Sequence, residues 1–199
     1  MHGDQGRHQL NGRAPMIHLR PPTFVYHNHN VEKLYKMDAN VVGNHATTLN
    51  ELVGKIYKAS YEAKYLQNVV INTHGFAGGF HVGNNVYLKG DLHAFTMLSG
   101  RIKTVWLTSC ETAKDSVGQS FCLELSKITR ANVVASADYC IVTWDEAVGL
   151  FLGSHKIDDY GGDVYVFRSN GTAKRVSDPV KELSDDSFRF TPTFRFPPR

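Results

Sequence analysis

The sequence contains few cysteines and no long apolar run, and its positive and negative charges nearly balance. The cysteines, Cys110, Cys122 and Cys140, lack the CxxC spacing typical of zinc and redox sites, which predicts reduced thiols. No stretch approaches the ~18 consecutive apolar residues of a membrane span, and residues 1–16 lack the apolar centre of a signal peptide. These absences predict a cytoplasmic protein without a membrane span. They leave open its export as an effector that needs no cleaved signal.

The weak net charge argues against several classes of partner. The chain has 22 lysines and arginines and 19 acidic residues, scattered along its length, and a net charge of +3. We therefore expect no nucleic-acid partner and no binding to an anionic membrane. A hydrophobic content of 42% over 199 residues is ordinary for one soluble globular domain. We predict a flexible leader over 1–20, the domain over 21–180 and an edge strand or tail over 181–199, and leave the oligomeric state unassigned.

Apolar periodicity alternates between strand and helix patterns along the domain. Thr48 is a predicted helix N-cap, because Glu51 follows it at the spacing of a capping box. Short apolar runs bounded by turn residues predict strands at 23–28, 68–73, 102–108 and 132–136. The other patterns predict helices at 49–66, 91–98 and 116–130, hairpins within 80–88 and 163–176, and a turn-rich segment at 40–48. This alternation predicts an α/β domain with a mainly parallel sheet.

Two of the predicted strands end in residues that can perform nucleophilic chemistry. One apolar run is followed by His74 and Gly75, and another is followed by Cys110. In an open α/β sheet the reacting groups gather at the carboxyl ends of parallel strands, so we expect His74 and Cys110 to lie at one edge. A cysteine with an imidazole nearby is the arrangement that a cysteine hydrolase requires.

The residues around this pair suit the remaining needs of such a reaction. A tetrahedral intermediate requires donors for its oxyanion, and the backbone N–H groups of Gly75 and Cys110 are the candidates. Gly75 has no side chain, so its N–H can approach a substrate carbonyl closely. Residues 111–113 turn the chain into the helix at 116–130, which predicts a thiol near a helix N-terminus, where a thiolate is favoured.

The segments NVVINTHGFAGGFHVG and KTVWLTSCETAKDSVG resemble cysteine peptidases of the caspase-type fold (clan CD), over residues 67–138. The nearest likeness is to the bacterial CHAT-like and toxin self-processing peptidases. The resemblance implies a three-layer sandwich with helices on both faces of a mostly parallel central sheet. It also implies hydrolysis of protein or peptide substrates through a thioester, with His74 and Cys110 as catalytic dyad and Gly75 and Cys110 as oxyanion hole. We expect no cofactor and no metal.

The resemblance also suggests where the substrate side chain would bind. In that fold, the pocket for the residue before the cut lies between the nucleophile strand and the next strand. Asp138, just after the strand at 132–136, would favour a basic substrate residue there. Glu111 is a second candidate for this substrate pocket, followed by Asp145 and Glu146.

Two other functions compete with a cysteine endopeptidase. The segment at 74–79 also resembles the oxyanion loop of a lipase, which suggests an α/β-hydrolase acting as a serine esterase. That fold needs a GxSxG elbow, whereas the segment at 118–122, which contains Ser120, lacks the final glycine and lies in a predicted helix. The other alternative is a catalytically inactive caspase-like module that binds partners.

Several further residues are set aside. Cys122 is predicted to be a core residue of a helix, and Cys140, the main rival nucleophile, is predicted to lie within a strand. His27 and His29 share one strand face. No further ligand lies at metal-site spacing, so we interpret both histidines as surface residues.

Overall fold

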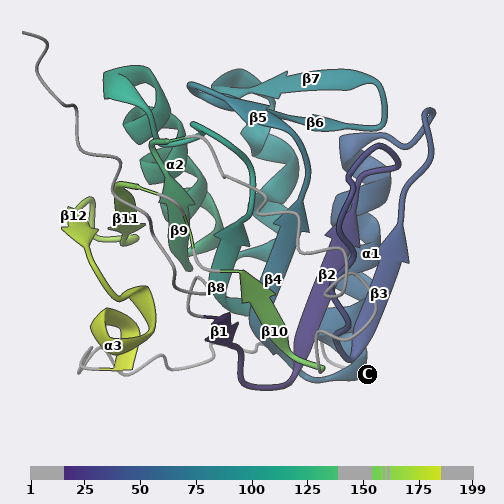
Figure 1. Ribbon diagram of the computed structural model, residues 1–199. Coiled ribbons are helices and arrows are strands. Elements are labelled where there is room, and N and C mark those ends of the chain that lie inside the picture. Colours follow the sequence, from purple (N-terminus) through teal and green to yellow (C-terminus); the bar gives the residue numbers. More distant parts are fainter. Residues whose placement is uncertain (1–15, 139–153, 159, 161, 185–199) are drawn as a thin grey trace, which may run out of the picture.

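The computed structural model describes residues 16–138, 154–158, 160 and 162–184 (Figure 1). Its elements are, in chain order, β1 (Met16–His18), β2 (Thr23–His27), β3 (Ala39–Val42), α1 (Leu49–Glu62), β4 (Leu66–Asn72), β5 (Gly75–Phe76), β6 (Gly79–Val82), β7 (Asn85–Leu88), the 3₁₀-helix η1 (Lys89–Leu98), β8 (Ile102–Leu107), α2 (Asp115–Thr129), β9 (Asn132–Ser136), β10 (Lys156–Asp158), β11 (Val164–Phe167), β12 (Ala173–Val176) and α3 (Pro179–Ser184). The predicted core strands and both predicted hairpins are present in this order.

The largest sheet has seven strands in the order β12-β11-β9-β8-β4-β2-β3 (Figure 1). The strands from β3 to β9 pair in parallel, whereas β11 runs antiparallel to both β9 and β12. The ribbon β1–β10 and the sheet β5–β6–β7 are wholly antiparallel. The sheet is therefore mixed, and the prediction of a mostly parallel sheet is wrong. The physical reason is that short hairpin connections, such as the one between β11 and β12, require antiparallel pairing.

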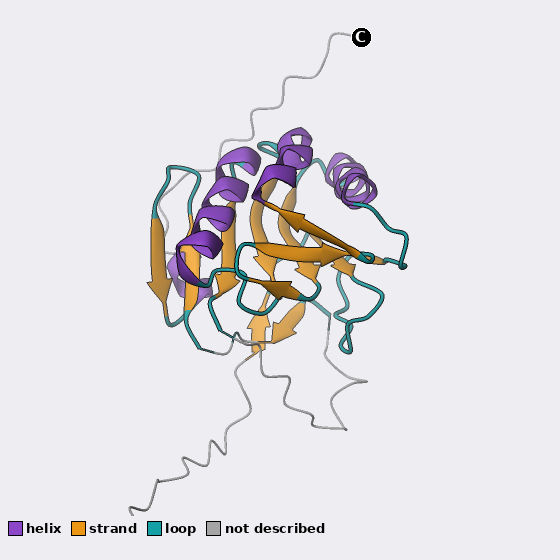
Figure 2. Cartoon of the chain, turned by 90° about the horizontal axis from the view of Figure 1, so that it is seen from above, coloured by secondary structure: helices purple, strands orange, loops and turns teal. Residues whose placement is uncertain are grey.

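Successive side chains of the central strands alternate between two buried faces. In β4, Val69 and Ile71 join one apolar cluster and Val70 joins the other. The first cluster also contains the buried faces of α1, η1 and α2, and Figure 2 shows the longer helices along one side of the sheet. The second cluster contains Ile17 of β1 and Ile157 of β10. In the described residues, this second face is thus covered by the β-ribbon and by loop residues such as Tyr35 and Met37, with α3 adding the helical cover.

The predicted start of α1 is confirmed, and its end lies earlier than predicted. Thr48 Oγ1 accepts the Glu51 N–H at 3.3 Å, and Glu51 Oε2 accepts the Thr48 N–H at 2.8 Å, which completes the capping box. The helix ends at Glu62 instead of near residue 66, because Lys64 adopts a left-handed φ of 69° and Leu66 begins β4.

Three predicted boundaries differ from the structure. The leader was predicted to extend to residue 20, but residues 16–18 form β1 with a buried Ile17. Part of the predicted turn segment at 40–48 belongs to β3, which pairs with β2. The predicted C-terminal edge strand or tail begins inside α3, at residues 181–184. Residues 1–15 and 185–199 of these two segments lie outside the described residues.

Candidate active site

The register of two central strands places His74 and Cys110 at equivalent positions. Strands β4 and β8 are parallel neighbours in which Ile71 is paired with Leu107. His74 and Cys110 each follow three residues after these partners, and the Thr108 N–H donates to Ile71 O at 3.2 Å to extend the pairing. Both strands run toward the small β5–β6–β7 sheet (Figure 1). The expectation that the two residues leave the sheet at one edge is consistent with this register.

Gly75 packs directly against the turn that contains Cys110. A Cβ atom added at Gly75 would lie 2.6 Å from Thr112 Oγ1, 2.7 Å from Ser109 Cβ and 2.9 Å from Cys110 O. Side chains do not tolerate such short contacts. The absence of a side chain at residue 75 therefore allows the His74–Gly75 backbone to approach the backbone of Cys110.

The turn after β8 is held by a hydrogen bond between two of its own side chains and by one to the segment after β9. Ser109 and Thr112 are fully buried, and their hydroxyl oxygens lie 2.7 Å apart in a hydrogen bond. The Glu111 N–H donates to Asp138 O at 3.0 Å, just beyond β9. Glu111 has a left-handed φ of 53°, a conformation that costs free energy in a residue with a side chain and persists only where its surroundings impose it. Cys110 is half-buried within this constrained turn.

Helix α2 begins immediately after the same turn. A Cβ atom at Gly118 would lie 2.5 Å from Thr112 O and 2.7 Å from the carbonyl carbon of Ala113. A glycine in the first turn of α2 thus lets the Cys110 turn rest on the helix. Gly75 and Gly118 contact the turn from two elements, so both sides of the turn depend on glycine.

The imidazole of His74 is exposed and has a defined partner. Its Nε2 lies 3.1 Å from Asn30 O, in the segment after β2. Because a carbonyl only accepts, this nitrogen carries the proton, and Nδ1 of the neutral ring is the proton acceptor. The neutral His74 is therefore suited to take a proton through Nδ1.

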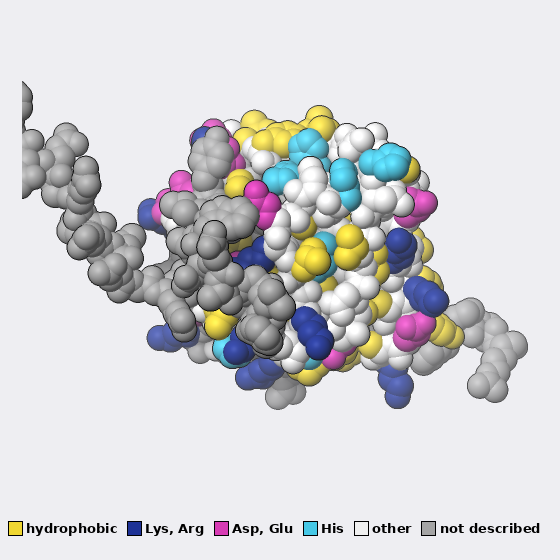
Figure 3. All heavy atoms as spheres, turned by 45° about the vertical axis from the view of Figure 1, so that its right-hand side comes forward, with side chains coloured by type: hydrophobic (Ala, Val, Ile, Leu, Met, Phe, Trp, Pro, Cys, Tyr) yellow, Lys and Arg dark blue, Asp and Glu magenta, His cyan; other side chains and the backbone are white. Residues whose placement is uncertain are grey.

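A second histidine lies beside His74. The His81 N–H donates to His74 O at 3.0 Å, and the His81 ring meets Phe76 edge-on with centroids 5.9 Å apart. Partial burial lowers the pKa of His81 below its usual value, and the nearby charge of His74 lowers it further. Figure 3 shows histidine side chains grouped on one face of the molecule. His81 lies within the small sheet and does not follow a core strand.

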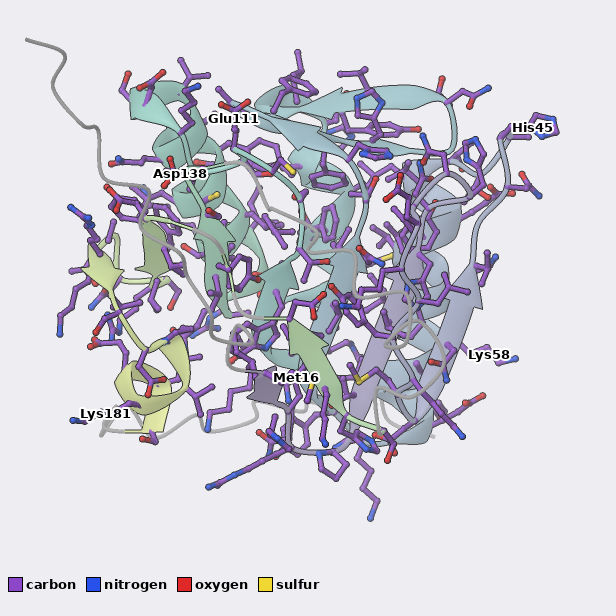
Figure 4. All side chains as sticks on the ribbon, viewed as in Figure 1. Met16, His45, Lys58, Glu111, Asp138 and Lys181 are labelled. Carbon is purple, nitrogen blue, oxygen red and sulfur yellow. The ribbon has the colours of Figure 1, made fainter. Side chains whose placement is uncertain are left out.

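The two carboxylates predicted to line the substrate pocket lie at the same end of the sheet as the Cys110 turn (Figure 4). Asp138 is exposed, and its Oδ2 accepts the Asp163 N–H at 2.5 Å. Glu111 forms an ion pair with Lys114. Both carboxylates thus already have one partner, and each keeps oxygen lone pairs for another. The other candidates, Asp145 and Glu146, lie outside the described residues, as does Cys140.

His27 is a buried structural residue, so its interpretation as a surface residue is wrong. It is 1% exposed, its Nδ1 lies 2.9 Å from Asn72 Nδ2, and its Nε2 lies 3.0 Å from Tyr35 O. Burial lowers the pKa of His27, which favours the neutral ring. The sequence did contain a signal for this burial, because His27 lies within an apolar run typical of a strand that is covered on both faces. His29 is exposed, and the described residues contain no group of ligands that could hold a metal ion.

The residues set aside as rival nucleophiles occupy a helix. Cys122 is a fully buried part of α2, as predicted, and burial raises the pKa of its thiol. Ser120 also lies within α2, where its Oγ accepts a hydrogen bond from Lys89 Nζ at 2.9 Å. A serine inside a helix lacks the strand-to-helix turn of a hydrolase elbow.

Comparison with protein families gives a match over more than half of the chain. The model of a family described as a domain of unknown function (DUF4347) matches residues 29–140, a span that includes both His74 and Cys110. No curated protein matches the chain. In the part of the chain that the structure describes, no helix is both long enough and apolar enough to span a membrane.

Proposed function

Because the chain belongs to the DUF4347 family, whose description assigns no activity, we propose a function from the site itself: the protein is a cysteine endopeptidase. The observation that carries this proposal is the packing of Gly75 on the turn of residues 109–112. Together with the β4–β8 register, this packing brings an exposed imidazole and a half-buried thiol to one edge of the sheet.

The proposed reaction has two halves, formation of a thioester and its hydrolysis, and both use the His74 imidazole and the Cys110 thiol. His74 Nδ1 takes the thiol proton as Cys110 Sγ bonds to the carbonyl carbon of the scissile peptide. The N–H groups of Gly75 and Cys110 donate to the oxyanion that forms. His74 then passes the proton to the leaving amine as the C–N bond breaks and a thioester remains. In the second half, His74 takes a proton from water as the water oxygen bonds to the thioester carbon. The C–S bond then breaks, the carboxylic acid product leaves, and His74 returns the proton to Cys110 Sγ.

The arrangement of the sheet supports a variant of the caspase-type sandwich. The proposed dyad follows two adjacent parallel strands, and helices pack against one face. The β1–β10 ribbon takes much of the place that helices would occupy on the other face. A thiol nucleophile must stay reduced, so we place the enzyme in the cytoplasm.

We further propose that the substrate carries a basic residue before the cut. Glu111 lies within the Cys110 turn and Asp138 lies beside it, just beyond β9, so both carboxylates provide negative charge close to Cys110 (Figure 4). A lysine or arginine side chain of a bound peptide would pair with the remaining lone pairs of these carboxylates.

The test combines thiol labelling with cleavage of a peptide library. Iodoacetamide should modify Cys110 faster than the buried Cys122, and the wild-type protein should cleave peptides. Cys110→Ala and His74→Ala should each abolish cleavage, whereas Cys122→Ala, the matched control, should retain it.

Three results would contradict the proposal. Cleavage undiminished in Cys110→Ala would exclude this nucleophile, and loss of cleavage in Cys140→Ala alone would transfer the role to that residue. Labelling of Ser120 by a fluorophosphonate would favour the serine esterase. Absence of cleavage of every library peptide, with Cys110 no more reactive than Cys122, would favour a module that only binds partners.

A further inference from the structure

A buried asparagine connects three segments beside the candidate site. Asn28 is 1% exposed and follows directly after β2. Its Oδ1 accepts from Tyr26 OH at 2.8 Å and from the Gly83 N–H at 2.7 Å. Its Nδ2 donates to Asn30 Oδ1 at 2.7 Å and to Gly83 O at 3.1 Å. A carboxamide has two N–H donors and two acceptor lone pairs, so all four hydrogen bonds of this side chain are made.

The same asparagine is connected to His74 by two routes. Its backbone N–H donates to Asn72 O at 2.9 Å, near the end of the strand that leads to His74. Its side chain holds Asn30, whose backbone carbonyl lies 3.1 Å from His74 Nε2. Both the backbone before His74 and the partner of its ring are therefore fixed by Asn28.

Asn30 is the exposed part of this connection. Loop backbone at the surface is ordinarily mobile, and a mobile carbonyl does not hold an imidazole ring in one orientation. The hydrogen bond from the buried Asn28 restricts Asn30 from the protein interior. Losing that bond would leave one N–H of the buried Asn28 carboxamide without its partner, so the melting temperature should fall as well.

We propose that Asn28 and Asn30 are positioning residues for His74. They hold the Asn30 carbonyl against Nε2, which keeps the ring proton on that nitrogen and keeps Nδ1 as the proton acceptor. The catalytic consequence rests on the proposed peptidase function, whereas the effect on the ring tautomer does not.

The decisive variant is Asn30→Ala, which removes the anchored side chain and leaves the buried Asn28 itself in place. Its kcat should fall about three- to tenfold, the size expected for one lost hydrogen bond, with KM unchanged. Long-range ¹H–¹⁵N NMR of the imidazole should show the His74 tautomer moving from Nε2–H toward a mixture. Asn28→Asp, which keeps the acceptor oxygen and loses the donors to Asn30 Oδ1 and to Gly83 O, should shift the tautomer in the same direction.

The matched control is Asn170→Ala. Asn170 is also exposed, and its Oδ1 accepts from the Thr172 N–H at 3.0 Å in the β11–β12 turn. This variant should leave both kcat and the His74 tautomer unchanged.

The two readouts separate the failure of this inference from the failure of the proposed function. An Nε2–H tautomer unchanged in Asn30→Ala would overturn the positioning role, whatever the activity. An inactive wild-type protein would overturn the peptidase proposal, and the NMR comparison would still decide the role of the asparagines. A fall in melting temperature with unchanged kcat and tautomer would assign both residues to stability alone.

Discussion

Replacing Gly75 by alanine tests how closely the two proposed catalytic strand ends approach each other. The added methyl group would meet the Thr112 hydroxyl at 2.6 Å, Ser109 Cβ at 2.7 Å and the Cys110 carbonyl at 2.9 Å. Ser109 and Thr112 are fully buried and bonded to each other, so neither can swing aside. The backbone of the Cys110 turn must therefore move by several tenths of an ångström.

The expected cost follows from overpacking of a buried contact. Such substitutions destabilise by about 1–3 kcal/mol, and about 2 kcal/mol lowers the melting temperature of a domain of this size by roughly 4–8 °C. The displacement also moves the Gly75 and Cys110 N–H groups away from the proposed oxyanion. Removal of one such donor costs about 100-fold or more in kcat, so we expect a loss of that size.

Gly54→Ala is the matched control for this substitution. Gly54 lies exposed in the middle of α1, and an added Cβ would meet nothing within 4 Å. Alanine should stabilise the helix there by up to about 1 kcal/mol and raise the melting temperature by roughly 2–4 °C. Calorimetry and peptide cleavage measure both variants. A Gly75→Ala protein with wild-type melting temperature and wild-type cleavage would refute the close packing of the strand ends.

Three further substitutions probe the buried polar groups. Thr112→Val leaves the Ser109 hydroxyl without its partner, so it should lower the free energy of urea unfolding by about 1–3 kcal/mol. The double variant with Ser109→Ala should recover part of that stability. If it recovers none, the hydroxyl pair is not the cause of the loss. Burial lowers the pKa of His27 from about 6.5, so its contribution to stability is complete above that pH and is lost as the pH falls toward the lowered value. His27→Gln should therefore flatten the pH dependence of the unfolding free energy below about pH 6.5, by at most about 1.4 kcal/mol per pH unit, and an unchanged slope would contradict this account.

Local chemistry explains which elements the sequence predicts well. Three kinds of signal act through residues that are neighbours in the sequence. They are the capping box of Thr48 and Glu51, the apolar runs of the central strands and the turn residues of both hairpins. Such signals are visible without the tertiary structure. Strands β1 and β3 were missed because each is short and forms through tertiary pairing, β1 with the distant β10 and β3 with β2.

The same distinction applies to the candidate site. His74 and Cys110 were predicted because each follows a recognisable strand. The asparagine connection was not predicted, because Asn28 is bonded to Gly83, far along the chain, and only the folded structure brings the two together. The orientation of Asp138 toward the backbone of Asp163 was likewise beyond a local pattern.

The β1–β10 ribbon has a consequence for the order in which the protein folds. It pairs Ile17 with Ile157, residues far apart in the sequence, and Lys33 adds an ion pair of 2.6 Å to Asp158. Contacts between such distant segments close a very large loop and form slowly. The helix-covered face of the sheet can assemble without them. The ribbon is therefore expected to dock last and to open first, so the amides of β1 and β10 should exchange before those of the helices on the opposite face.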